Sequence, residues 1–192
     1  MLKTRFLVAF FILFNVAAQA QKTETFIINP SKSLVKWAGK KIVGGNTEGT
    51  ILVSKGSLDF ASKQLKSGEI VMDVTSINSE KASPRLVAHL KNQDFFDVEK
   101  HPTASFVITS VKAGNNPQVT GKLTIKGITK ELSFPAQITY GKDLVVAKAS
   151  GIKVNRTLFD VKYRSGSIFS GLGDGAIEDD FVLDITLVSD KK

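Results

Sequence analysis

The side chains best suited to chemistry in this chain are two histidines and a group of carboxylates near them. His89 and His101 lie close in sequence to Asp94, Asp97 and Glu99. Such side chains bind Zn²⁺, but known sites use recurring spacings that these five residues do not follow. We therefore expect no metal site and assign the two histidines a structural or surface role.

A glycine-rich segment, residues 171–176, formally fits the dinucleotide-binding fingerprint. That motif works only between a strand and a helix, whose N-terminus receives the pyrophosphate. The sixteen residues that follow are typical of a strand instead, so we interpret the segment as a flexible loop. Four acidic residues in and after it lack the alternating spacing of a calcium loop, which favours a solvated acidic loop. These four residues are Asp174, Glu178, Asp179 and Asp180.

Nucleophilic catalysis also finds no support in the sequence. Cysteine is absent, which excludes thiolate chemistry and disulfide bonds, and no serine stands in a nucleophile-elbow motif. Asn155–Thr157 matches a glycosylation acceptor, which has no meaning in a bacterial protein. We therefore expect a protein that is not an enzyme, has no cofactor and obtains its stability from a packed core.

The first twenty residues have the three parts of a secretory signal peptide. Lys3 and Arg5 precede an apolar run over 6–16, and Ala18–Ala20 supplies a cleavage site of small residues. The run is shorter than the roughly 20 residues that span a bilayer. We expect residues 21–192 to form a single exported domain, periplasmic or secreted, with no membrane span.

The basic charge does not indicate a nucleic-acid partner. Removing residues 1–20 takes away two cations and lowers the formal charge from +8 to +6. The chain has 22 lysines but only 4 arginines, whereas base and phosphate recognition relies on the arginine fork. Solubility and loose attraction to anionic surfaces are the expected consequences of this charge.

Alternation of apolar and polar residues with period two dominates the rest of the chain and predicts half-buried strands. The clearest run places Leu132, Phe134 and Ile138 on one face and Ser133 and Gln137 on the other. The predicted strands cover residues 25–29, 33–40, 49–60, 66–77, 103–113, 119–125, 132–140, 143–155 and 181–188. Turns are predicted at 29–30, 44–46, 67–68, 114–117, 126–127 and 141–143.

One segment departs from this pattern. Ser83 and Pro84 are typical of a helix N-cap and first turn, and Leu86, Val87 and Leu90 then repeat at helical spacing. A short helix over 84–92 is expected, followed by a turn with two aromatic residues at 94–98. The fold class is therefore all-β, an antiparallel sandwich or barrel with a short helical insertion near residues 84–97.

Three stretches together resemble the YceI-like family of bacterial polyisoprenoid-binding proteins. They are HLKNQDFFDVEKHPTASF at 89–106, GKLTIKGITKELSFPA at 121–136 and VNRTLFDVKYRSGS at 154–167. The resemblance implies an eight-stranded, lipocalin-like barrel, usually periplasmic, that holds a polyisoprenoid, isoprenoid quinone or fatty-acid derivative. Some members are dimers, so a homodimer is one expected state. His101 departs from the tyrosine that many relatives have before the proline.

An eight-stranded barrel has room for its own side chains or for one slender ligand. The expected lumen residues are Trp37, Phe106, Ile108, Leu123, Ile125, Phe134, Ile138 and Val154. Arg156 is expected at the barrel end, where it either contacts a ligand head group or holds a loop. We expect an exported carrier or reservoir of a long-chain lipid or isoprenoid. The alternative is a solid-cored adhesion module whose outer lysines, such as Lys122 and Lys126, bind anionic surfaces.

Overall fold

The structure is a computed structural model that describes residues 22–192. Within that range it contains ten strands, one α-helix and three short 3₁₀ turns. The strands are β1 (Thr23–Ile28), β2 (Leu34–Lys40), β3 (Asn46–Ala61), β4 (Gln64–Asn78), β5 (Thr103–Lys112), β6 (Gln118–Ile125), β7 (Ile128–Pro135), β8 (Gln137–Tyr140), β9 (Leu144–Asn155) and β10 (Asp180–Lys191). The helix is α1 (Pro84–Lys91), and the 3₁₀ turns are η1 (Pro30–Lys32), η2 (Arg156–Phe159) and η3 (Gly173–Gly175). The predicted leader at 1–20 lies outside the described residues.

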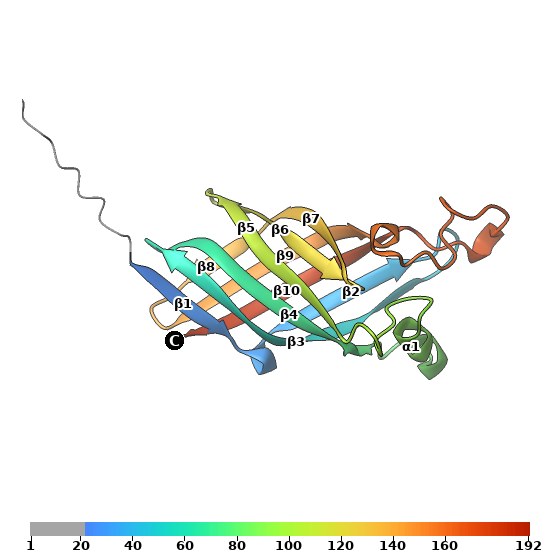
Figure 1. Ribbon diagram of the computed structural model, residues 1–192, viewed down its shortest axis with the longest axis horizontal. Helices are drawn as coiled ribbons and strands as arrows, with labels where there is room; N and C mark the ends of the chain where they lie inside the picture. The colour runs from blue at the N-terminus through green and yellow to red at the C-terminus, as the bar shows by residue number, and fades with distance from the viewer. Residues whose placement is uncertain (1–21) are drawn as a thin grey trace, which may run out of the picture.

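All ten strands belong to one antiparallel sheet that closes into an elongated barrel (Figure 1). The sheet order is β7-β6-β5-β4-β3-β1-β10-β9-β8, and β2 pairs with β3 and β10 just as β1 does. β1 and β2 therefore share one position, interrupted at Pro30 by η1. β7 and β8 are separated only by Ala136, so one bent strand joins the two sheet edges. The predicted eight-stranded barrel is confirmed: when β1 with β2 and β7 with β8 are each counted as one strand, the ten strands make eight positions around the barrel.

The turns follow the sequence closely, with one exception. Lys126 and Gly127 both have positive φ, 50° and 73°, as the predicted tight hairpin requires. The predicted turn at 67–68 is wrong, because Gly68 lies inside β4. A Cβ there would approach the carbonyl oxygen of Ser57 to 2.7 Å, so this glycine permits close strand packing. The real β3–β4 turn is formed by two residues with positive φ that are not glycines, at 62–63.

Aromatic packing closes one end of the barrel. The rings of Phe26, Phe60 and Tyr140 meet edge to face with centroids 5.2–5.5 Å apart, and both phenylalanines are fully buried. The Tyr140 hydroxyl donates a hydrogen bond to Glu24, which also accepts one from Lys191 Nζ at 2.6 Å. These two bonds hold the pKa of Glu24 below its ordinary value, with Lys191 the larger cause. We call this end of the barrel the closed end.

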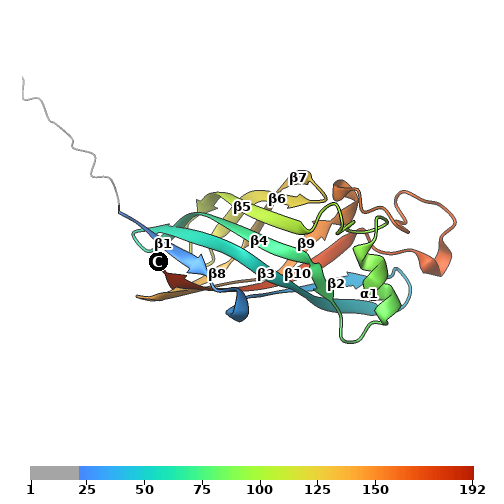
Figure 2. The same ribbon diagram turned by 60° about the horizontal axis from the view of Figure 1, so that its bottom comes forward.

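Helix α1 lies beside the opposite end of the barrel (Figure 2). As predicted, Ser83 caps it and accepts a hydrogen bond from the Leu86 backbone N–H, and Pro84 occupies its first turn. The chain between η2 and β10 forms a long loop that extends past the barrel at this same end. None of the helices in the described range is long and apolar enough to cross a bilayer.

Candidate ligand-binding lumen

The inward faces of the strands enclose an apolar cavity with two lobes. Lobe 1 has a volume of about 70 Å³ and lobe 2 about 170 Å³. Val35, Met72, Leu123 and Leu183 line both lobes, so the two are adjacent parts of one lumen. Sites for drug-sized ligands typically measure ~300–1,000 Å³. A long ligand would therefore require side chains to move apart, and the flexible Met72 at the junction suits that.

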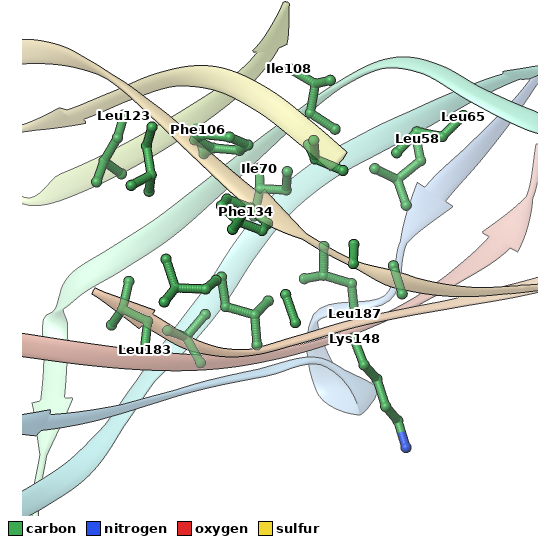
Figure 3. Close-up of a pocket in the computed structure, with 18 of the residues that line it drawn as sticks. Leu58, Leu65, Ile70, Phe106, Ile108, Leu123, Phe134, Lys148, Leu183 and Leu187 are labelled. Carbon is green, nitrogen blue, oxygen red and sulfur yellow. The ribbon is translucent and has the colours of Figure 1, made fainter. Parts of the chain in front are cut away.

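Lobe 1 lies within the barrel and is lined almost entirely by aliphatic and aromatic side chains (Figure 3). Phe106 and Phe134 pack against each other within it, with ring planes tilted by 39° and ring centroids 5.3 Å apart. Lys148 is the one lining residue that is not apolar, and its amine points away from the other side chains. The lobe offers no polar partner and suits a hydrocarbon chain.

Lobe 2 lies toward α1 and the long loop, and its lining is more varied. Leu90 from the helix and Phe95 from the following turn are both buried against it. Lys40, Lys41 and Glu178 stand at its border. This lobe thus leads from the apolar interior to the polar end of the barrel.

Seven of the eight lumen residues predicted from the sequence line this cavity. Lobe 1 contains Phe106, Ile108, Leu123, Phe134 and Ile138, and lobe 2 contains Trp37, Leu123 and Ile125. Val154 is buried in the core but borders neither lobe. It lies at the end of β9, where the chain turns into η2.

Trp37 lines lobe 2 and carries a buried polar group without a partner in the described part of the chain. Its side chain is 9% exposed, and its buried indole N–H has no hydrogen-bond acceptor among residues 22–192. Buried donors in folded proteins almost always have a partner, because an unpaired one costs about 1–3 kcal/mol. A ligand acceptor that reaches this N–H would remove that cost.

Arg156 is buried beside lobe 2, and its donors are used within the protein. Nε donates to the carbonyl of Glu178 at 3.0 Å, and Nη2 donates to that of Ile177 at 3.1 Å. Nη1 donates to the carbonyls of Val161 at 2.8 Å and Tyr163 at 3.0 Å. Burial lowers the pKa of the guanidinium, and a nearby carboxylate partly offsets this. Of the two predicted roles, the geometry favours holding the loop.

The partner carboxylate belongs to Asp179, whose Oδ1 lies 3.8 Å from Arg156 Nη2. Asp179 also accepts hydrogen bonds from the hydroxyls of Ser165 and Ser167. Burial raises the pKa of Asp179, but the two hydroxyls and the arginine outweigh it and hold that pKa below its ordinary value. The predicted solvated acidic loop is therefore wrong at Asp179, which fixes the loop to the barrel. The glycine-rich segment leads into β10, as expected, and not into a helix.

The sequence reasoning missed the lining from helix α1 and the turn after it, namely Leu86, Leu90, Phe95 and Phe96. A signal was present: the apolar face of a short helix and two adjacent aromatics must cover some other apolar surface. His89 takes part in this cover, because its ring packs edge to face on Phe95 at 5.0 Å between centroids. Residues 22–192 contain no group of three or more histidine or acidic side chains that could hold a metal ion.

The outer surface matches the predicted alternation only in part. Lys122 and Gln137 are exposed, as expected. Lys126 lies outside too, but its amine donates to the carbonyls of Gln93 at 3.4 Å and Asp160 at 3.2 Å. It joins three loops, so it is less available to an external partner than Lys122.

A closed antiparallel barrel with an apolar lumen and a helix at one end defines the lipocalin-like class. Within that class, the model of the YceI-like domain matches residues 26–189, and the chain belongs to this family. A UPF0312 protein of Pseudomonas aeruginosa is 30% identical over 132 residues, 68% of either chain. The YceI protein of Escherichia coli is 27% identical over 145 residues, 74% of either chain.

Solved structures share the fold. BcnA of Burkholderia cenocepacia superposes with a TM-score of 0.70 at 23% identity, covering 84% of this chain and 98% of that one. A polyisoprenoid-binding domain from Saccharophagus degradans gives a TM-score of 0.65 at 8% identity, covering 87% and 98%. The YceI protein of Campylobacter jejuni gives 0.62 at 25% identity, covering 80% and 90%.

Proposed function

We propose that this protein holds the apolar tail of one long-chain amphiphile in its lumen and acts as a carrier or reservoir. The observation that supports this most is the continuous apolar lining of the two lobes, from lobe 1 inside the barrel to lobe 2 under α1. The family, and the polyisoprenoid-binding domain among its structural relatives, support a polyisoprenoid, isoprenoid quinone or fatty-acid derivative. The role is binding, without chemical transformation of the ligand.

The tail should dominate the affinity. Each buried CH₂ contributes about 0.8 kcal/mol, so several isoprene units give a nominal gain above ~15 kcal/mol. One hydrogen bond to a charged group contributes only about 1.5–3 kcal/mol. Association and ordering costs reduce the total but leave this ranking unchanged. Tail length is therefore the main criterion by which the ligand is selected.

The ligand's polar end is proposed to lie in lobe 2. Trp37 lines that lobe and its indole N–H lacks an acceptor among the described residues, whereas the Arg156 guanidinium is already engaged by four carbonyl groups. A neutral acceptor, such as a quinone, ester or amide oxygen, suits a single N–H donor better than a phosphate does. Export by the leader at 1–20, to the periplasm or outside the cell, is part of the same proposal.

Two substitutions on one hairpin test the carrier function. Phe134→Asn places a polar group in lobe 1, and we expect it to reduce the lipid that co-purifies with the protein. It also removes packing worth about 3 kcal/mol, so binding is compared only for folded protein. Lys122→Glu on the outer face is the matched control and should leave the lipid unchanged. If Lys122→Glu instead abolishes attachment to anionic surfaces and the wild type carries no lipid, the adhesion function is correct.

A further inference from the structure

The open end of the barrel carries an exposed apolar group that the lumen does not explain. Four side chains, Ile42, Val43, Ile168 and Phe169, are 44–56% exposed. We call these four residues the apolar collar. Ile42 and Val43 lie in the turn between β2 and β3, and the other two lie in the long loop between η2 and β10.

The two segments that carry the collar are in direct contact. The Ile42 backbone N–H donates to the carbonyl of Ala176 at 3.0 Å, and Lys41 forms a β-bridge with Ile177. A Cβ at Gly166 would lie 3.1 Å from Ile42 Cδ1, which places this side chain against the loop. The collar is therefore one surface built from two distant parts of the sequence.

The long loop that carries two of the collar residues is also tied to the barrel. Arg156 and Asp179 tie the loop to the barrel through hydrogen bonds to backbone carbonyls and to the hydroxyl groups of Ser165 and Ser167. A loop fixed in this way keeps its apolar side chains in water, which is unfavourable in free energy because apolar surface is better buried. Fixed exposure of this kind is typical of a surface that binds a partner.

The position of the collar identifies the partner. Lobe 2 is lined by Lys40, Lys41 and Ile177 from these same two segments, whereas the Phe26–Phe60–Tyr140 cluster closes the other end. In both views the loop extends beyond the barrel at the end where lobe 2 lies (Figures 1 and 2). A lipid that enters or leaves lobe 2 would pass the collar.

We propose that the apolar collar inserts into a lipid bilayer and docks the open end of the barrel on the membrane that supplies or receives the ligand. This rests on the proposed carrier function. Apolar side chains on loop tips enter the headgroup region of a bilayer. The turn at 41–45 and the loop at 160–179 together carry three basic and four acidic side chains, so docking relies on the apolar side chains and not on net charge.

A vesicle-sedimentation assay with the exported chain tests this proposal. The vesicles contain equimolar phosphatidylcholine and phosphatidylglycerol. Wild type should bind, and the double variant Ile168→Ser with Phe169→Ser should lower the partition coefficient about tenfold or more. The matched control is Ile27→Ser with Leu144→Ser. These residues are 43% and 41% exposed and flank Asp190 on neighbouring strands near the closed end. The control should change the partition coefficient less than twofold.

Binding of farnesol, measured by calorimetry without vesicles, separates this proposal from the carrier function. The collar variant should bind farnesol like wild type, because the collar side chains lie outside both lobes. Wild type that binds farnesol but not vesicles would overturn membrane docking alone. Equal loss of vesicle binding in the collar and control variants would also overturn it. Vesicle binding without farnesol binding would contradict the carrier function instead. A wild-type dimer in sedimentation velocity that the collar substitutions dissociate, without vesicle binding, would assign the collar to self-association.

Discussion

Replacing Arg156 should destabilise the protein more than any surface charge substitution. The side chain is 5% exposed and donates to four backbone carbonyls, and its charge faces Asp179. Arg156→Met keeps much of the volume but leaves those carbonyls and one carboxylate without their partner. Removing one member of a buried ionic network costs about 3–5 kcal/mol, and each bond to a charged donor contributes about 1.5–3 kcal/mol. We expect a loss of about 4 kcal/mol in the free energy of unfolding.

Urea denaturation followed by circular dichroism measures this loss. Arg164→Met is the control, because its guanidinium is exposed; it lies over the Tyr163 ring, 6.0 Å from the centroid, and beside Gly175. That contact is worth about 0.5–1 kcal/mol at an exposed site. If Arg156→Met cost less than about 1 kcal/mol, or no more than the control, the loop would not depend on this arginine.

Three further predictions follow from single contacts. Trp37→Phe should weaken binding of an isoprenoid quinone about tenfold but leave binding of an isoprenoid hydrocarbon of equal length unchanged. Titration calorimetry of both ligands checks this, and an equal loss of affinity for the two would contradict it. The pKa of Glu24 is lower in the folded protein than its ordinary value of 4.5, so the ionised side chain stabilises the fold above pH 4.5, and this stabilisation is lost as the pH falls through the folded-state pKa. Thermal melts should therefore show Glu24→Gln less stable than wild type at pH 7, with the two melting temperatures converging below pH 4.5. Gly121→Ala should cost about 2 kcal/mol in urea denaturation, since the new Cβ would lie 2.5 Å from Phe106 Cζ and from a backbone oxygen; a stable variant would show that the strands can separate.

Period-two alternation predicted every strand position because each strand has one face in the barrel and one in solvent. The same pattern assigned Phe134 and Ile138 to the interior, and both line lobe 1 although they stand on either side of the bend at Ala136. The bend itself was not predictable, since the alternation continues through it and only pairing with β6 and β9 separates the two halves. Likewise, the β3–β4 turn lacks the glycine or asparagine by which such turns are found.

The parts of the site that sequence could not supply depend on contacts between distant segments. Arg156 was placed at the barrel end, yet its role depends on carbonyls up to 22 residues away. The helix was predicted from its own cap and periodicity, but its packing over lobe 2 through Leu86 and Leu90 depends on tertiary structure. The apolar collar has no sequence signature, because two segments far apart in the chain contribute two residues each to it.

The content of the lumen tests the carrier function most directly. Protein purified without detergent from the cells that produce it is extracted with organic solvent, and the extract is analysed by mass spectrometry against an extract of Phe134→Asn. We predict one long-chain isoprenoid or fatty amphiphile, close to equimolar with the wild-type protein and depleted in the variant. Wild-type protein that carries no such lipid and takes none up from a panel of isoprenoid and fatty ligands would contradict the function proposed for this barrel.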